Sequence, residues 1–495
     1  MFEIKNFSPR EYQKSILEIC KENNTLVILP TGLGKTSIAI LLAIHELNKN
    51  PNYKILITAP TKPLVSQLCN EFKNKTNVEK EKINLLTGAI AQNKREILWN
   101  ESLIIGATPQ TIAKEVEKNK INLNSVSLLI IDECHRSRMK YASTIIAKDF
   151  KNKVLALTAS PGNTKEKIDE ICKNLNIQKI EIRTEEDEEV KQYIQKKDTS
   201  SILVELPPEL LELQKLLKDV KNEKLLDLKK VGFTKPTYLI NKKDLILLQN
   251  RFRAEISRKG FMAFYGISLT SQILKLDHAL DLLETQGLNQ LKDYFEKLKT
   301  ETAKASKQIL NNEKIKKVIE KNEELSKTFK HPKIHKLKEV ITNELTRDPN
   351  TKIIVFANFR NSVSEIVNEL KSVENVRPIF LLGQKEGITQ KHQIQTIKNF
   401  EDNTFNIMVC SQVGEEGLSI AGAKLAIFYD SVPSEIRNIQ RRGRVGRLEA
   451  GKVIFLMTKN SRDIAYFYTS KRKEVKMKNI VNKLKNEKEK QLTLE

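Results

Sequence analysis

The sequence of 495 residues has few cysteines and no long apolar run. Its five cysteines, Cys20, Cys69, Cys134, Cys172 and Cys410, are scattered without a CxxC pair. This spacing argues against a disulfide framework or a zinc site and fits a reduced compartment. No stretch of eighteen or more apolar residues and no signal-peptide pattern occurs, so we expect a soluble cytoplasmic protein with no membrane partner.

Histidine is also scarce, with six residues in the chain. His331 and His335 are four apart, a spacing that places two side chains on one face of a helix. Because no third ligand stands nearby in the sequence, we favour a solvated helix surface over a metal site here.

Negative charge is the other shortage, because 85 Lys and Arg stand against 62 Asp and Glu, a net charge of +23. Residues 1–190 have 28 basic against 24 acidic residues, residues 191–335 have 29 against 19, and residues 336–495 have 28 against 19. The excess therefore lies in the later parts of the chain, where it favours a polyanionic partner. The alternative is a lysine-rich composition that covers every surface.

A glycine-containing loop follows the first apolar run of the chain. Leu26 to Leu29 are apolar, PTGLGKT occupies Pro30 to Thr36, and good helix formers continue from Ser37 to Leu47. A strand, a turn and a helix start are the context of a phosphate-binding loop, in which glycines let backbone N–H groups point at phosphate oxygens.

We therefore assign Thr31, Gly32, Gly34, Lys35 and Thr36 to nucleotide binding. Lys35 would reach the outer phosphates and the Thr36 hydroxyl would hold Mg²⁺. The match to GxxxxGK[ST] is imperfect, since Leu29 stands at the first glycine position. The structural alternative is a tight turn with a surface lysine.

Two adjacent carboxylates end a later apolar run. Leu128 to Ile131 predict a central parallel strand, and Asp132 and Glu133 follow it directly. Ligands of open α/β sheets lie at the carboxyl ends of strands. Asp132 is the candidate Mg²⁺ ligand, and Glu133 is the candidate base that deprotonates the attacking water.

Strands alternate with helical patterns over residues 1–190, which predicts a doubly wound α/β domain. Residues 191–335 change to apolar positions at spacings of three and four, which predicts a helical region with basic outer faces. Alternating strands and helices return over 336–470, and residues 471–495 form a lysine-rich helix or frayed tail. The fold class is α/β, with two doubly wound parallel-sheet domains and an inserted all-α domain.

The second α/β domain has no GK[ST] of its own but contains QRRGRVGR, Gln440 to Arg447. Four arginines within eight residues are costly unless they face phosphates. We therefore expect one ATP site in a cleft, with the loop and carboxylates on the first domain and arginine fingers on the second. Near the amino terminus, Gln13 can bond an adenine edge through its amide.

Nine segments occur in order along almost the whole chain: Gln13, PTGLGKT, APTKPLVSQ (59–67), TPQT (108–111), DECH (132–135), TAS (158–160), VFANFR (355–360), SQVGEEGLSI (411–420) and QRRGRVGR (440–447). This ordered set resembles the motifs of superfamily 2 helicases, whose two α/β domains are RecA-like. The inserted helices resemble those of the archaeal Hef and eukaryotic FANCM helicases and of the Dicer and RIG-I-like group. KLDHALDLLETQGLNQL (275–291), VPSEIRNIQRRGRVGR (432–447) and DIAYFYTSKRKEVKM (463–477) are similar to Hef.

The resemblance implies an ATP- and Mg²⁺-dependent motor that acts on forked, branched or duplex DNA in replication-fork repair, associated with the nucleoid. It implies an insertion that grips duplex DNA. It also implies γ-phosphate contacts for Gln440, Arg444 and Arg447, and coupling of hydrolysis to movement through His135, Thr158 and Ser160. By the same resemblance, the residues that lie along the nucleic-acid backbone are Thr61, Lys62, Thr108 and Gln412.

The chain departs from the Hef pattern at three points. Ser419 stands where Asp is usual, which puts one contact of that motif in question. Cys134 makes the box DECH, commoner in the RNA-sensing relatives, and we interpret this side chain as a spacer. No XPF-like nuclease motif follows the motor, so we expect no nuclease activity and allow a separate nuclease partner.

Three hypotheses follow. The first is an ATP-dependent DNA helicase or branch-remodelling translocase whose domains close on ATP. With aromatics at 6% and a single tryptophan, Trp99, we expect phosphate contacts rather than base stacking as its main grip. The second is an ATPase stimulated by duplex RNA. The third is a basic scaffold that has lost its ATP site, which the complete set Lys35, Asp132, Glu133, Arg444 and Arg447 argues against.

Overall fold

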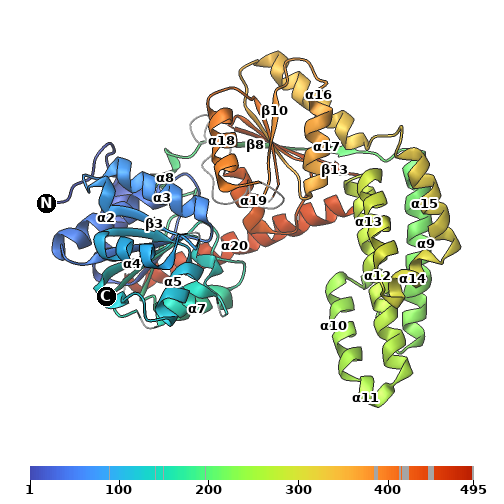
Figure 1. Ribbon diagram of the computed structural model, residues 1–495, viewed down its shortest axis with the longest axis horizontal. Coiled ribbons are helices and arrows are strands. Elements are labelled where there is room, and N and C mark those ends of the chain that lie inside the picture. Colours follow the sequence, from blue (N-terminus) through green and yellow to red (C-terminus); the bar gives the residue numbers. More distant parts are fainter. Residues whose placement is uncertain are drawn as a thin grey trace.

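The computed structural model describes residues 1–88, 90–139, 141–148, 150–195, 197–383, 388–411, 414, 423–443 and 451–492. Two parallel sheets and a helical bundle form three parts arranged in a row (Figure 1). We call them domain 1, domain 2 and the insertion. The amino terminus lies in domain 1, domain 2 is central, and the insertion projects from domain 2 on the side away from domain 1 (Figure 1).

Domain 1 is a parallel sheet in the order β3-β4-β2-β5-β6-β1-β7. Its strands are β1 (Thr25–Ile28), β2 (Lys54–Thr58), β3 (Ile83–Leu86), β4 (Ile104–Ala107), β5 (Val126–Ile131), β6 (Lys153–Thr158) and β7 (Lys179–Ile182). Its helices are α1 (Glu11–Glu22), α2 (Lys35–Lys49), α3 (Lys62–Lys75), α4 (Gln92–Glu101), α5 (Pro109–Glu117), α6 (Ala142–Lys148), α7 (Lys165–Asn174) and α8 (Glu188–Lys191).

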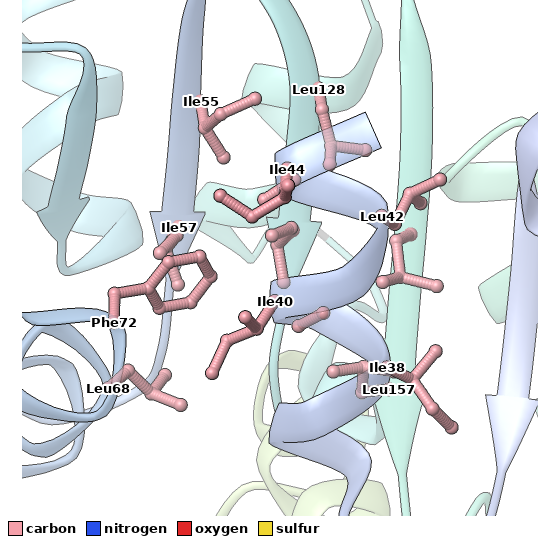
Figure 2. Close-up of a cluster of buried hydrophobic side chains, with 14 of the residues drawn as sticks. Ile38, Ile40, Leu42, Ile44, Ile55, Ile57, Leu68, Phe72, Leu128 and Leu157 are labelled. Carbon is pink, nitrogen blue, oxygen red and sulfur yellow. The ribbon is translucent and has the colours of Figure 1, made fainter. Parts of the chain in front are cut away.

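Every residue of β5 is buried, because helices cover both faces of this sheet. On one face, α2 and α3 pack Ile40, Ile44 and Phe72 against Ile57 and Leu128 of the central strands (Figure 2). On the other face, Trp99 and Ile112 belong to a second core. These two cores fix the strand ends that make up the site.

The insertion is all helical among its described residues. Its elements are α9 (Pro208–Lys230), the short helix η4 (Thr237–Leu239), α10 (Lys242–Ala254), α11 (Ile256–Lys259), α12 (Phe261–Thr285), α13 (Leu288–Thr300), α14 (Lys304–Leu310) and α15 (Glu313–Leu325). The central helix α12 packs on α9, with Leu213, Leu217, Leu276 and Leu283 in their shared core. This confirms the helical domain that the apolar spacing predicts.

Domain 2 is a parallel sheet in the order β10-β11-β9-β12-β13-β8. Its strands are β8 (Lys197–Val204), β9 (Ile353–Phe356), β10 (Pro378–Leu381), β11 (Ile407–Cys410), β12 (Leu425–Phe428) and β13 (Gly451–Thr458). Its helices are α16 (Pro332–Arg347), α17 (Arg360–Leu370), α18 (Gln390–Glu401), α19 (Glu435–Arg442) and α20 (Arg462–Leu492).

Strand β8 belongs to domain 2, although the predicted domain boundary assigns its residues to the helical domain. Residues after 190 are expected to begin the helical domain, but Lys197–Val204 pair in parallel with Gly451–Thr458 at the edge of the second sheet. Most of this strand is exposed, and its first five residues, KDTSS, are polar. An exposed polar edge strand has no apolar alternation, so the sequence pattern could not indicate it.

Of the two expectations for the lysine-rich end, a helix or a frayed tail, the structure shows the helix, α20. It runs unbroken from domain 2 to domain 1 (Figure 1). Phe467 packs edge-on against Phe455 of β13, with ring centroids 4.9 Å apart. Further along, Met477 and Val481 are buried in the second core of domain 1. The lysine-rich end of the chain is therefore a helix that connects the two domains.

His331 is buried, whereas the sequence predicts that it lies on a solvated helix surface. It is buried at the start of α16, where its Nδ1 accepts the Lys333 N–H and its Nε2 donates to the Glu284 carbonyl, both at 3.2 Å. Burial lowers the pKa of His331 to about 3. Among the described residues no group of three His, Cys, Asp or Glu side chains is placed to hold a metal ion. None of the described helices has both the length and the apolarity that crossing a bilayer requires.

Candidate nucleotide site and interdomain cleft

The candidate site residues of domain 1 follow the carboxyl ends of five adjacent strands. The phosphate loop follows β1, Thr61 follows β2, Thr108 follows β4, Asp132 follows β5, and Thr158 ends β6. Because these strands are parallel and adjacent in the order β4-β2-β5-β6-β1, their ends meet at one edge of the sheet. The structure therefore brings together segments that are more than 120 residues apart in the sequence.

The phosphate loop has the backbone geometry of an anion site. Gly32 and Gly34 have φ values of +86° and +76°, in the left-handed region that favours glycine. Gly34 also precedes α2 directly, and a Cβ there would lie 2.4 Å from Nε2 of Gln13. Lys35 Nζ donates to the carbonyls of Leu29 at 3.0 Å and Pro30 at 3.4 Å. This loop, the α2 amino terminus and a lysine fit a phosphate chain.

Gln13 supports the loop from α1. Its side chain is buried, with Nε2 donating to the Leu33 carbonyl at 3.3 Å and Oε1 accepting from the Arg10 N–H at 3.0 Å. The Tyr12 hydroxyl donates to the same Leu33 carbonyl at 2.7 Å. The Arg10 guanidinium lies 3.9 Å from the centre of the Tyr193 ring. Sequence reasoning missed Tyr193, because only folding places the segment after α8 against α1.

Asp132 and Glu133 stand at the end of β5 in different backbone conformations. The Asp132 N–H donates to the Thr58 carbonyl at 2.9 Å, which continues the sheet. Glu133 has a φ of +52°, in the left-handed region that few non-glycine residues occupy. Burial and the neighbouring Glu133 raise the pKa of Asp132, and Lys35 acts in the opposite direction. Asp132 together with Thr36 offers the hard oxygen ligands that Mg²⁺ prefers.

A chain of contacts leads from Glu133 to the end of β6. His135 Nδ1 lies 3.3 Å from Glu133 Oε2 and 3.2 Å from Thr158 Oγ1. Thr158 Oγ1 in turn accepts the Ser160 N–H at 3.1 Å. Cys134, which lies between Glu133 and His135 in the sequence, has its side chain buried in the core, and burial raises the pKa of its thiol. The structure thus joins the three predicted coupling residues to Glu133.

The candidate nucleic-acid residues of domain 1 lie at helix starts along the same edge. Thr61 precedes α3, Lys62 is its first residue, and Thr108 precedes α5. Thr108 Oγ1 is 3.0 Å from Thr111 Oγ1. Thr61 Oγ1 is buried and makes no hydrogen bond within the described ranges of the chain. These positions place two helix amino termini at the edge, whereas Gln412 lies outside the described residues.

Domain 2 contributes the end of α19 to the phosphate loop. Gly443, which follows α19, lies so near Thr31 that a Cβ on it would be 2.8 Å from Thr31 Oγ1. Gln440 is buried, and both polar atoms of its amide lack a hydrogen bond to any described residue. Arg444, Arg447 and Ser419 lie outside the described residues. The structure therefore brings the residue just before Arg444 into contact with the loop.

Arg441 and Arg442, the first two arginines of QRRGRVGR, both contact protein groups in the structure. Arg441 is fully buried, with its guanidinium beside the rings of Phe356 and Phe428, at 5.3 and 5.4 Å from their centres. Arg442 Nη2 donates to Glu474 of α20 at 2.5 Å. Both guanidinium groups stabilise the position of α19. The sequence could not distinguish these two arginines from Arg444 and Arg447, because all four belong to the same motif.

A polar chain behind α19 was also missed. Arg441 donates to the Asp430 carbonyl at 3.1 Å and to Asn358 Oδ1 at 2.8 Å. The Asp430 carboxylate accepts from Gln286 Nε2 at 2.7 Å, and Gln286 Oε1 accepts from Ser362 Oγ at 2.7 Å. Gln286 follows α12, so this chain connects the insertion to α19. A lone glutamine in a helical region gives no sequence signal of such a role.

A cavity of about 400 Å³ lies beside the phosphate loop, between the two domains. The loop lines it with Thr31 and Gly32, α19 lines it with Ile439, and α20 lines it with Met477 and Val481. Lys35, Asp132 and Glu133 are not among its lining residues. The cavity therefore flanks the candidate catalytic edge and borders the junction between the domains.

Comparisons with known proteins agree with this arrangement. Family models match residues 10–168 (DEAD/DEAH box helicase), 209–327 (putative ATP-dependent RNA helicase, helical bundle) and 332–449 (helicase conserved C-terminal domain). The crystal structure of the Pyrococcus furiosus Hef helicase domain is 40% identical, has a TM-score of 0.70, and matches 93% of this chain and 98% of its own. The chain belongs to the Hef-type helicases. This family of ATP-dependent helicases has the two RecA-like domains and inserted helical domain expected from the sequence.

Curated relatives of this Hef-type chain carry helicase names. The putative ATP-dependent RNA helicase MJ1505 of Methanocaldococcus jannaschii is 38% identical over 97% of this chain and 61% of its own length. The ATP-dependent DNA helicases mph1 of Neurospora crassa and fml1 of Schizosaccharomyces pombe are 31% and 30% identical over 92% of this chain. The chain spans 42% and 58% of those two proteins. It therefore corresponds to part of each of these relatives.

Proposed function

We propose that this chain is an ATP-dependent DNA helicase or translocase that remodels forked or branched DNA. The contact of Gly443 with Thr31 carries the proposal, since it sets the end of α19 in domain 2, one residue before Arg444 in the sequence, against the phosphate loop of domain 1. One nucleotide held at this junction would draw the two domains together. Hydrolysis would release them, and the cycle would move nucleic acid across the helix starts at Thr61 and Thr108.

Glu133 is the proposed general base. Its left-handed backbone turns it away from the path of β5, and His135 beside it links the carboxylate to Thr158. A base that accepts the proton of the attacking water contributes roughly a hundredfold or more to such reactions. Mg²⁺, bound by Thr36 and Asp132, would supply charge neutralisation on the phosphates. Arg444 and Arg447 would stabilise the developing charge from the other domain.

DNA is the proposed polymer because the Mph1 and Fml1 relatives are named DNA helicases and the solved relative is Hef. Action on DNA would place the protein at the nucleoid, where a separate nuclease could act with it. The second candidate is an ATPase stimulated by duplex RNA. It is favoured by the RNA helicase name of MJ1505 and by the name of the helical-bundle family.

The test is the steady-state ATPase rate with forked DNA, single-stranded DNA, linear duplex DNA and duplex RNA at one fixed salt concentration. We expect forked DNA to stimulate the rate most. Glu133→Gln should lower kcat by roughly a hundredfold or more, and Lys35→Ala should remove nucleotide-dependent activity. Glu101→Gln, an exposed carboxylate of domain 1, is the matched control and should retain the wild-type rate.

Two results would overturn the proposal. Activity that persists in Lys35→Ala would place the ATP site elsewhere. Stimulation by duplex RNA with none by any DNA would assign the protein to the second candidate, since 2′-hydroxyl contacts distinguish the two polymers.

A further inference from the structure

Helix α19 of domain 2 lies against α20, the helix that connects the two domains (Figure 1). Ile439 of α19 packs against the second core of domain 1, in which Met477 and Val481 of α20 are buried. An element of domain 2 thus has an apolar contact with domain 1. Because Met477 and Val481 anchor α20 there, any bond that ties α19 to α20 also sets where α19 lies relative to domain 1.

Two side-chain bonds tie α19 to α20. Asn438 Nδ2 donates to Ser470 Oγ, and Arg442 Nη2 donates to Glu474 Oε2, both at 2.5 Å. Residues four apart on a helix share a face, so one face of each helix carries both bonds. The Asn438–Ser470 bond is buried, whereas the Arg442–Glu474 pair stands at the last residue of α19. The second bond therefore holds that end of the helix.

Arg442 is held at both its side chain and its backbone, immediately before the contact with the phosphate loop. Its carbonyl accepts from Lys197 Nζ of β8 at 3.1 Å, while its guanidinium bonds Glu474. Gly443 is the next residue, and a Cβ on it would lie 2.8 Å from Thr31 Oγ1. A shift of Arg442 therefore moves Gly443 relative to the loop.

The Arg442–Glu474 pair lies in a partly covered place next to the loop. Its side chains are 26% and 17% exposed, and both line the cavity together with Thr31 and Gly32. A charge-assisted hydrogen bond in such a place is stronger than an ion pair on an open surface. A second cation, Lys478, lies 3.9 Å from Glu474 Oε1 and is 55% exposed, so Arg442 is the closer and better covered partner.

We propose that Glu474 is a positioning residue for ATP hydrolysis: by holding Arg442 from α20, it fixes the end of α19 against the phosphate loop. Hydrolysis requires groups of both domains in one geometry, and a misplacement of about 1 Å can cost roughly a hundredfold in rate. The bond refers that geometry to α20 and hence to domain 1. This inference rests on the proposed function and adds a residue outside the nine ordered segments of the sequence.

The experiment measures ATP hydrolysis by the full chain at saturating forked DNA. Glu474→Gln keeps the size of the side chain but removes its charge, and it should lower kcat roughly tenfold. The KM for ATP and the affinity for ADP should change less than about twofold, because only the transition state needs the fixed end of α19. The affinity for ADP with aluminium fluoride, a mimic of the transferring phosphate, should fall in step with kcat.

Glu487→Gln is the matched control. Glu487 lies on the same helix, and its pair with Lys165 of domain 1, at 3.4 Å, is exposed. Loss of a carboxylate charge from this exposed pair should leave kcat at the wild-type value.

A second set of variants tests whether the two side chains act as a unit. Arg442→Gln should lower kcat as Glu474→Gln does, and the double variant should be no slower than either single variant. Arg442→Glu/Glu474→Arg exchanges the two charges and should recover a large part of the wild-type rate, which neither half of the exchange should do alone.

Amide hydrogen exchange tests the contact without any hydrolysis. In the absence of nucleotide, residues 435–443 should exchange faster in Glu474→Gln than in wild type, while the strands of both sheets exchange as before. Glu487→Gln should leave the exchange of residues 435–443 at the wild-type rate.

The inference fails on any of three results. An unchanged kcat in Glu474→Gln, or unchanged exchange in residues 435–443, would show that the pair does not position α19. Single losses that multiply in the double variant would show that Arg442 and Glu474 act independently. A parallel loss of kcat, ADP affinity and melting temperature would assign the pair to overall stability. Wild-type protein that hydrolyses no ATP would overturn the proposed function instead, and hydrogen exchange would still test the contact of α19 with α20.

Discussion

The contact between Gly443 and Thr31 depends on the absence of one methyl group. Gly443 has a φ of −68°, so an alanine fits the backbone without strain. The obstacle is the added Cβ, which would lie 2.8 Å from Thr31 Oγ1 and 3.1 Å from Thr31 Cβ. Because Thr31 is branched at Cβ, it has little freedom to move away. A single atom thus decides how near α19 comes to the phosphate loop.

We predict that Gly443→Ala lowers the DNA-stimulated kcat by roughly tenfold. Overpacking costs about 1–3 kcal/mol, and the cost falls on the closed arrangement of the domains rather than on either core. The melting temperature should therefore stay close to that of wild type. The matched control is Gly88→Ala, at an exposed glycine whose added Cβ meets no atom within 4 Å. An unchanged kcat in Gly443→Ala would show that the contact does not occur in the catalytic cycle.

At the scale of elements, the ends of α12, β12 and α19 are joined through buried polar groups. Gln286, Asp430 and Arg441 form the chain, and Lys333 lies beside it with Nζ 2.5 Å from Asp463. Burial raises the pKa of Asp430, and Lys333 acts against that rise. Buried polar groups of this kind hold elements in one register when all are satisfied. These bonds therefore join the insertion directly to domain 2.

We predict that Gln286→Leu uncouples polymer binding from hydrolysis. The change removes the donor to Asp430 and the acceptor for Ser362, at a cost of about 1–3 kcal/mol. Forked DNA should still bind, but its stimulation of the ATPase rate should fall several-fold, with the rate in the absence of DNA little changed. Gln249→Leu is the matched control, since Gln249 bonds Ser271 within the insertion. Full stimulation in Gln286→Leu would refute the coupling role.

At the scale of the whole molecule, α20 limits how far domains 1 and 2 can separate. Its first turns pack on domain 2, and Met477 and Val481 are buried in domain 1. Lys485 pairs with Asp187, and Lys165 lies 3.4 Å from Glu487. The exposed Lys165–Glu487 pair contributes little, so the buried Met477 and Val481 and the partly buried Lys485–Asp187 pair make the main contact. Arg442, next to the candidate arginine segment, also bonds α20 through Glu474.

We predict that Val481→Asp releases α20 from domain 1. Loss of a buried valine costs about 1.5–3 kcal/mol, and the new carboxylate would have to leave the apolar core. The radius of gyration from small-angle X-ray scattering should rise, and trypsin should cut α20 faster. Val475→Asp lies on the same helix at a side chain that is 52% exposed, so it should behave as wild type. An equal radius of gyration for both variants would contradict the role of α20 in limiting the separation of domains 1 and 2.

Several features followed from the sequence because they depend on local chemistry. PTGLGKT needs glycines at positive φ, and Asp132 and Glu133 directly follow a strand of apolar residues, so each motif predicts its own backbone. Parallel strands carry such motifs to one edge, which is why the shared edge could also be expected. The catalytic roles assigned to these residues stay predictions.

By itself, the sequence determined the fold class, the helical insertion and the strand ends that carry the candidate site, because periodicity and turn chemistry are local. Only the tertiary structure decided that β8 joins the second sheet, that α20 returns to domain 1, and that Arg441 is buried. These features depend on contacts between segments that are distant in the sequence, such as Arg441 with Phe356, or on an edge strand with no apolar pattern. Long-range pairing leaves no periodic mark in one segment, so it appears only when the whole chain is folded.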